Sequence, residues 1–302
     1  MTSAEIIEEI GRLKEQRNAV ILGHFYQRPE VQDISDYVGD SYGLSKQAAA
    51  TTAEVIVFCG VHFMAESAYI LSPDKTVLLP EIEAGCPMAD MADEQDLIAL
   101  KAKHPKAAVV SYVNTSAAVK AESDICCTSA NVLQVIKSLP QKEIIFTPDR
   151  NMGRYIAEQT DKKIILWEGY CYTHDEMRAE DFARAQQQHP DALTVVHPEC
   201  PPEILALADH ITGTSGMMKL AASEPHTTFI IGTECGMGYA LQKTAPDKKF
   251  VFPSDDMVCA TMKLTSLDSV LNSLRNLEHP ITVPEGIREK AYRALNRMLQ
   301  VT

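Results

Sequence analysis

The chain carries one pattern three times, with nearly constant spacing between corresponding residues. An apolar run that ends in polar or aromatic side chains occurs at residues 19–26, 107–114 and 192–199. Intervals of 88 and then 85 residues relate His24, Tyr112 and His197. The same intervals relate further landmarks, namely Ser41, Ser129 and Thr214, and the lysines Lys75, Lys163 and Lys248. A sequence built from three copies of one pattern is expected to fold into three similar units.

Each copy predicts three parallel strands separated by helices. The strands are continuous apolar runs rich in β-branched residues, which is typical of parallel sheets covered by helices on both faces. We expect strands at residues 20–23, 55–59, 76–79, 108–111, 143–147, 164–167, 193–196, 228–232 and 250–252. Alternating strands and helices predict an α/β fold of three αβα three-layer domains, related by a pseudo-threefold axis around one central site.

The repeat also predicts the domain organisation. We expect the first αβα unit at residues 1–85, the second at 86–171 and the third at 172–283. A further helix at 284–302 is expected to complete the first unit. Thr2 and Glu5 predict a capping box at the start of the first helix, because the two side chains can satisfy each other's backbone N–H groups.

Composition restricts the class of function. The net charge of −13 argues against nucleic acid, which requires a basic surface. The sequence lacks the run of roughly 18 apolar residues that a membrane helix needs, and its start does not resemble a signal peptide. We therefore expect a cytoplasmic protein without membrane contact. Eight cysteines in such a protein indicate metal or redox chemistry, because cytoplasmic thiols are kept reduced.

Polar side chains follow the first strand of each copy. Ligands of parallel αβα units gather at the carboxyl ends of the strands. A single histidine or tyrosine there is more often a structural group, but three pairs in register favour one shared site. The candidate residues at these strand ends are His24, Tyr26, Tyr112, Asn114, His197 and Glu199.

Hydroxyl side chains form a second repeated set. Ser41, Ser129 and Thr214 each precede a predicted helix. Such residues are commonly helix N-caps. Because all three share one repeat position, we also expect them to hold a phosphate or carboxylate at the helix start.

One cysteine follows the third strand of each copy: Cys86, Cys171 and Cys259. Three converging thiolates suit iron–sulfur or zinc. A vacant fourth position favours a [4Fe–4S] cluster with one open iron that acts as a Lewis acid. His174 is a candidate fourth ligand of a Cys₃His zinc site, which stays the alternative. We interpret the other five cysteines as small buried residues: Cys59, Cys126, Cys127, Cys200 and Cys235.

These motifs resemble the quinolinate synthase family over essentially the whole chain. The resemblance is carried by residues 23–27, 39–41, 60–66, 85–89, 112–114, 169–171, 197–199 and 233–234. It implies three αβα domains around a pseudo-threefold axis, with one ligand to the [4Fe–4S] cluster from each domain. Two departures stand out. Met257 and Met262 flank a lone Cys259, so a regulatory disulfide is not expected there, and Gly213 stands where relatives can have serine.

The resemblance further implies a reaction and roles for residues. Iminoaspartate would condense with dihydroxyacetone phosphate to quinolinate, phosphate and two waters in NAD biosynthesis, with L-aspartate oxidase or dehydrogenase as the possible supplier of iminoaspartate. Tyr26, His197 and Glu199 are the candidates for proton transfer. The residues expected to contact substrate are His24, Ser41, Tyr112, Val113, Asn114, Ser129, His174, Pro198 and Thr214.

Two other functions stay open. Another open-iron [4Fe–4S] dehydratase or reductive deoxygenase would use the same three cysteines, and only the product distinguishes it. A non-catalytic iron–sulfur sensor or electron carrier would require four cysteine ligands, whereas the repeat supplies three equivalent ones.

Overall fold

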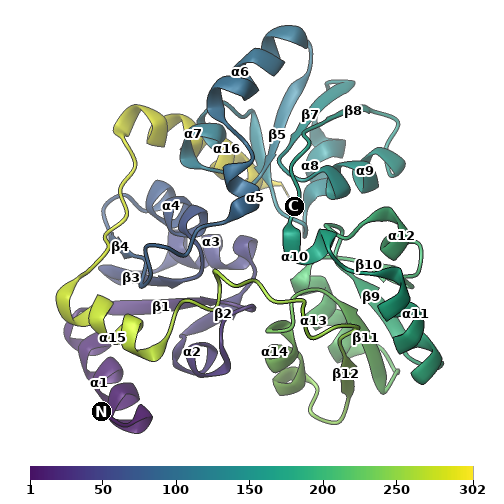
Figure 1. The fold of residues 1–302 in the computed structure, drawn as a ribbon. Helices are drawn as coiled ribbons and strands as arrows, with labels where there is room; N and C mark the ends of the chain where they lie inside the picture. The colour runs from purple at the N-terminus through teal and green to yellow at the C-terminus, as the bar shows by residue number, and fades with distance from the viewer. Residues whose placement is uncertain (302) are drawn as a thin grey trace.

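Three small parallel sheets surround a common centre (Figure 1). The computed structural model describes residues 1–301. The strand orders are β2-β1-β3-β4, β6-β5-β7-β8 and β10-β9-β11-β12, so all three sheets have the same topology. Every strand pair in them is parallel. The predicted α/β fold of three αβα units is therefore confirmed.

The elements follow one another as the repeat requires. The first sheet and its helices comprise α1 Ser3–Gln16, β1 Ala19–His24, α2 Pro29–Ile34, β2 Tyr37–Gly39, α3 Ser41–Ala50, β3 Val55–Cys59, α4 His62–Leu71 and β4 Thr76–Leu78. The second group comprises α5 Pro87–Asp90, α6 Glu94–Lys103, β5 Ala108–Tyr112, α7 Ala117–Ala121, β6 Ile125–Cys127, α8 Val132–Ser138, β7 Glu143–Thr147, α9 Arg150–Glu158 and β8 Lys163–Leu166. The third comprises α10 Tyr172–Asp175, α11 Ala179–Gln188, β9 Leu193–Val196, α12 Pro202–Leu205, β10 His210–Ile211, α13 Thr214–Ser223, β11 Thr228–Gly232, α14 Met237–Thr244 and β12 Lys249–Val251. Two helices end the chain, α15 Leu267–Asn276 and α16 Glu285–Gln300.

Each sheet has one strand that the apolar pattern did not predict. These are the short edge strands β2, β6 and β10, of two or three residues each. An aspartate precedes each of them and accepts a backbone N–H from the neighbouring strand at 2.8 Å. These aspartates are Asp36, Asp124 and Asp209, and they obey the 88- and 85-residue intervals. The repeated aspartates therefore indicate, in the sequence itself, where the edge strands lie.

One repeat landmark needs correction. Lys75 and Lys248 each donate from Nζ to a backbone carbonyl, that of Ala53 and that of Glu224. In the second unit the corresponding bond, to Leu139, is made by Lys162. Lys163 instead begins β8 and pairs with Glu143. The second unit is therefore one residue shorter before its last strand than the spacing of the lysines suggested.

Apolar residues on both faces of each strand explain the layers. In the first sheet Ile21 and Val57 are buried with Ile10 of α1 and Leu271 of α15. On the other face Leu22, Ile56 and Phe58 are buried with residues of α3 and α4. Burial of such side chains stabilises each sheet by about 25 cal/mol per Å² of apolar surface removed from water.

The two last helices return to the first and second units. α15 packs against α1, whereas α16 contacts both α4 and α7 (Figure 1). Ala291, Leu295 and Met298 of α16 are buried in the core that these two units share. The boundaries at 85/86, 171/172 and 283/284 stay predictions, and residue 302 lies outside the described residues.

Two smaller points concern the helices. The predicted capping box is confirmed, because Thr2 Oγ1 accepts the Glu5 N–H and Glu5 Oε2 accepts the Thr2 N–H. Among residues 1–301, no helix has the length and apolar character needed to cross a membrane.

Candidate active site

A cavity lies where the carboxyl ends of the three sheets meet. It encloses about 660 Å³ not filled by protein atoms, including the part that opens to solvent. The predicted site residues that line it are His24, Tyr26, Ser41, Cys86, Tyr112, Asn114, Ser129, Cys171, His174, His197, Glu199, Thr214 and Cys259. Val113 and Pro198 are buried but do not line it. The repeat therefore brings thirteen predicted side chains from all three units to one place.

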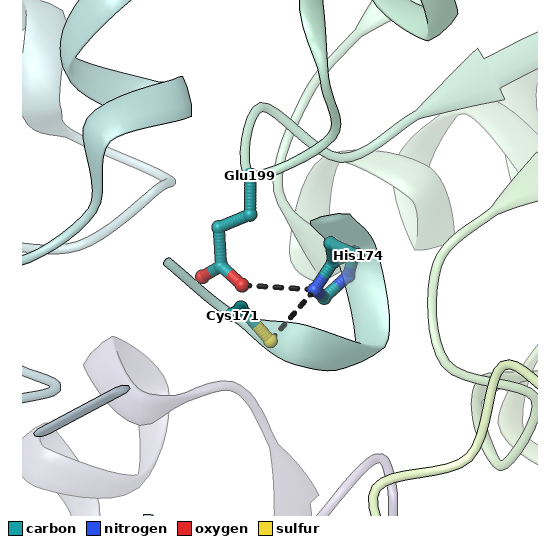
Figure 2. A group of neighbouring side chains, drawn as sticks. All are labelled: Cys171, His174 and Glu199. Atoms are coloured by element: carbon teal, nitrogen blue, oxygen red, sulfur yellow. Dashed lines mark hydrogen bonds and ion pairs between the residues drawn. The ribbon is translucent and has the colours of Figure 1, made fainter. Parts of the chain in front are cut away.

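Side chains of two units hold Glu199 at the wall of this cavity. Its Oε1 accepts the hydroxyl of Tyr112 at 2.7 Å, and its Oε2 lies 2.9 Å from His174 Nδ1. Burial alone would raise the pKa of Glu199, but His197 and His174 and the two hydrogen bonds hold it below its usual range. Figure 2 shows the carboxylate, the His174 ring and the Cys171 sulfur in one group. Glu199 therefore stays ionised at neutral pH.

Thr233 connects the group of Glu199, His174 and Cys171 to Tyr26 of the first unit. Its Oγ1 lies 2.6 Å from the hydroxyl of Tyr26 and 2.9 Å from His174 Nε2. A continuous line of contacts thus runs from Tyr26 through Thr233, His174 and Glu199 to Tyr112, joining residues of all three sheets. Sequence reasoning gave Thr233 no role, because its partners lie 59 and 207 residues away.

Both other histidines of the cavity are neutral at pH 7. Burial lowers the pKa of His24 to about 3 and that of His197 to about 4. His24 Nδ1 accepts the Tyr26 N–H at 3.1 Å, and His197 Nδ1 accepts the Glu199 N–H at 3.4 Å. A neutral imidazole that accepts at Nδ1 carries its proton on Nε2. Each ring is therefore an N–H donor at Nε2.

The repeated hydroxyls are not helix caps. Asp40 caps α3 by accepting the Gly43 N–H at 2.7 Å, and Ser41 is the first helical residue. Gly213 precedes α13 without a side-chain cap, and Thr214 again begins the helix. Ser129 lies before α8, which begins only at Val132. These three hydroxyls line the cavity, and two of them stand at helix N-termini, where anions are favoured.

The three cysteines of the repeat meet at the same cavity. Each follows the last strand of one sheet, and all are free thiols. Burial, together with the charge of neighbouring groups, raises the pKa of Cys86 to about 12 and that of Cys171 well above its usual value. Deprotonated sulfur at this place thus requires a cation, and no lysine or arginine of the described residues lines the cavity. Three soft donors around one point fit an iron–sulfur centre.

The donor atoms permit a second grouping. Those of Cys171, His174 and Glu199 lie within 4.8 Å of one another, as in a metal site. Both ring nitrogens of His174 are already used, however, Nε2 by Thr233 and Nδ1 by Glu199 with Cys171 Sγ at 3.2 Å. His174 is thus better placed to hold Glu199 than to be the fourth ligand of a zinc ion.

The remaining cysteines lie outside the cavity. The structure buries Cys59, Cys126, Cys127 and Cys200, as expected, whereas Cys235 is only half-buried. The interpretation of Cys235 as a buried residue is therefore wrong.

Each of the three parallel-sheet units contributes one cysteine, and an acid, histidine or tyrosine, to a common cavity. This arrangement defines an α/β enzyme with a candidate metal site between its units. Comparison with known proteins makes this specific. A family model described as quinolinate synthetase A protein matches residues 8–300. The chain belongs to this family.

Curated relatives match along their whole length. The quinolinate synthase of Methanosarcina barkeri is 56% identical over 301 residues, which cover 100% of this chain and 99% of the relative. That of Geobacter metallireducens is 55% identical with the same coverage. That of Desulforudis audaxviator is 56% identical over 298 residues, covering 98% of both chains.

Proposed function

We propose that this chain is a quinolinate synthase, which condenses iminoaspartate with dihydroxyacetone phosphate to quinolinate, phosphate and two waters in NAD biosynthesis. The observation that carries this proposal is the identity of 55–56% to full-length quinolinate synthases. The cavity agrees with it, because polar side chains of all three units line a space suited to a small anionic substrate.

The cofactor belongs to the same proposal. A [4Fe–4S] cluster held by Cys86, Cys171 and Cys259 would supply an open iron that polarises carboxylate, hydroxyl or ketone oxygens of the substrate. The support is the convergence of three thiols on the cavity and the engagement of His174 elsewhere.

Anionic groups of the substrate would be held without lysine or arginine. Ser41 and Thr214 offer hydroxyl and backbone N–H groups at the N-termini of α3 and α13, and Ser129 adds a hydroxyl from the second unit. His24, Tyr112 and Asn114 would orient the dicarboxylate. Asn114 Oδ1 is buried without a protein partner, as expected of a group that bonds to a ligand.

Proton transfer is assigned to three side chains. Glu199 is an ionised acceptor at the cavity wall. Burial raises the pKa of Tyr26 well above its usual value, so its hydroxyl keeps its proton. His197 is a neutral donor at Nε2. Loss of phosphate, tautomerisation and ring closure each require such positioned donors and acceptors.

The cellular setting is part of the same proposal. We place the enzyme in the cytoplasm, with iminoaspartate supplied by oxidation or dehydrogenation of L-aspartate.

Anaerobic purification tests the proposal directly. We expect a brown protein with visible absorption and about four iron and four sulfide per chain. Iminoaspartate and dihydroxyacetone phosphate should then yield a pyridine dicarboxylate that absorbs in the near ultraviolet. A colourless zinc protein, or a cluster protein that forms no such product, would contradict it.

A pair of cysteine variants tests the ligands. Cys171→Ala should lose the cluster's visible absorption, because it removes one of three sulfur ligands. Cys235→Ala should keep that absorption, because Cys235 lies outside the cavity. Retained absorption in Cys171→Ala would show that the ligand is misassigned.

A further inference from the structure

Two buried carboxylates occupy the same position in the second and third units. Asp149 lies two residues after the end of β7, and Glu234 lies two residues after the end of β11. The interval between them is 85 residues, the same that relates the cavity residues of these units. Both side chains are 0% exposed, and neither lines the cavity. The reaction described above uses neither of them.

Each carboxylate contacts the cysteine of its own unit. Asp149 Oδ2 accepts the backbone N–H of Cys171, and Glu234 Oε1 accepts that of Cys259, both at 3.2 Å. The second oxygen accepts the N–H of Met152 in one case, at 2.6 Å, and of Gly236 in the other, at 2.7 Å. Each acid thus connects, by hydrogen bonds, the residues that follow a central strand with the loop that carries the cysteine.

The first unit lacks this device. Val61 stands two residues after the end of β3, and it is apolar and buried. The loop before Cys86 is held instead by a backbone bond from the His62 N–H to the Ala84 carbonyl at 2.8 Å. Over residues 1–301, no carboxylate is found to accept the N–H of Cys86.

Glu234 has one contact that Asp149 lacks. Its Oε1 lies 2.8 Å from Lys263 Nζ, which also donates to the backbone carbonyl of Tyr26. The Cys259 loop is thereby connected to the loop of the first unit that carries a proton-transfer candidate.

We propose that Asp149 and Glu234 are positioning residues that hold the Cys171 and Cys259 loops for a bound metal centre, whereas Cys86 is held without such a partner. The inference rests on the proposed function for the metal centre itself. Groups that hold metal ligands in place typically contribute about 10–100-fold in metal affinity or activity.

Isosteric amides test this role. Asp149→Asn and Glu234→Gln keep the shape of the side chain and replace one acceptor oxygen by an amide NH₂ group. In the anaerobically purified protein, we expect each variant to lose iron to a chelator about tenfold faster than wild type. Asp209→Asn is the matched control, because Asp209 also accepts a backbone N–H, that of Thr194, away from the cysteines. It should lose iron at the wild-type rate.

The outcomes separate this inference from the proposed function. Wild-type rates of iron loss in both amide variants would overturn the positioning role and leave the enzyme assignment intact. Wild-type protein without iron or sulfide would instead overturn the proposed cofactor. In that case alkylation of the thiols decides: Asp149→Asn should speed modification of Cys171, and Glu234→Gln that of Cys259. Equal alkylation rates in all proteins would then overturn the positioning role.

Discussion

At the scale of single residues, Glu199 shows how neighbours set the state of a buried acid. Two donors, from Tyr112 and His174, face its two oxygens, so the ionised form persists although the side chain is 3% exposed. Glu199→Gln keeps the shape and removes the charge. We expect it to retain the cluster spectrum and to lower kcat by about 10²–10⁴-fold, as for loss of a general acid or base. Steady-state assays under anaerobic conditions measure this.

The control for this variant lies four residues further along the chain. Glu203 is exposed at the start of α12, so Glu203→Gln should leave kcat unchanged. Wild-type kcat in Glu199→Gln would remove Glu199 from the proton-transfer candidates.

The buried histidines make stability depend on pH. The pKa of His24 is lowered to about 3, whereas an unfolded histidine titrates near 6.5. Between these two pH values, His24 therefore binds a proton in the unfolded state but not in the folded state. Above pH ~6.5 His24 is neutral in both states and does not lower the free energy of unfolding. As the pH falls from there toward 3, His24 lowers the free energy of unfolding by up to about 1.4 kcal/mol per pH unit.

His24→Gln should therefore flatten the fall of the unfolding free energy between pH 6.5 and 4. Denaturant unfolding at a series of pH values measures it. The exposed His210 gives the control, since His210→Gln should leave the slope unchanged. An equally steep fall in His24→Gln would show that His24 is protonated in the folded protein.

At the scale of elements, long central strands were predictable and short edge strands were not. Residues 55–59 and 228–232 are apolar on both faces, and they form β3 and β11 as expected. β10 has only two residues and one exposed side, so hydrophobic periodicity cannot mark it. Its position depends on the Asp209 bond to Thr194, a contact between residues 15 apart. The sequence indicates this bond only because the aspartate recurs at the same position of each repeat.

Gly232 gives a test of packing within an element. It ends β11, and a Cβ there would lie 2.6 Å from Val196 Cγ1 and 2.7 Å from Phe182 Cζ. Both neighbours are buried and stiff, so Gly232→Ala should lower stability by about 1–3 kcal/mol. Thermal unfolding measures it. Gly286→Ala in α16 is the control: nothing lies within 4 Å of its Cβ, so the helix should gain stability. An unchanged Tm for Gly232→Ala would contradict this account of the packing.

At the scale of the whole molecule, the cavity exists only because three units meet. The repeat identified the residues at the strand ends, since equivalent positions must face one another around a pseudo-threefold axis. It could not identify the contacts between units. Tyr112 and Glu199 are 87 residues apart, and Tyr26 and Thr233 are 207 apart, so no local pattern connects them. These contacts follow from the docking of the units, which is set by their surfaces rather than by their internal periodicity.

A substitution of Thr233 therefore tests both the docking of the units and its effect on the reaction. Thr233→Val is nearly isosteric and removes the bonds to Tyr26 and His174 at once. Because His174 is buried and loses its partner at Nε2, we expect a cost of about 1–3 kcal/mol there, and a smaller cost at the half-buried Tyr26 hydroxyl. If the third unit orients Tyr26 and His174 for the reaction, kcat should fall at least tenfold while the iron content stays at the wild-type level. Thr244→Val, at the exposed end of α14, should change neither quantity. A Thr233→Val protein with wild-type kcat and KM would mean that the line of contacts from Tyr26 to Tyr112 holds the units together without serving the reaction.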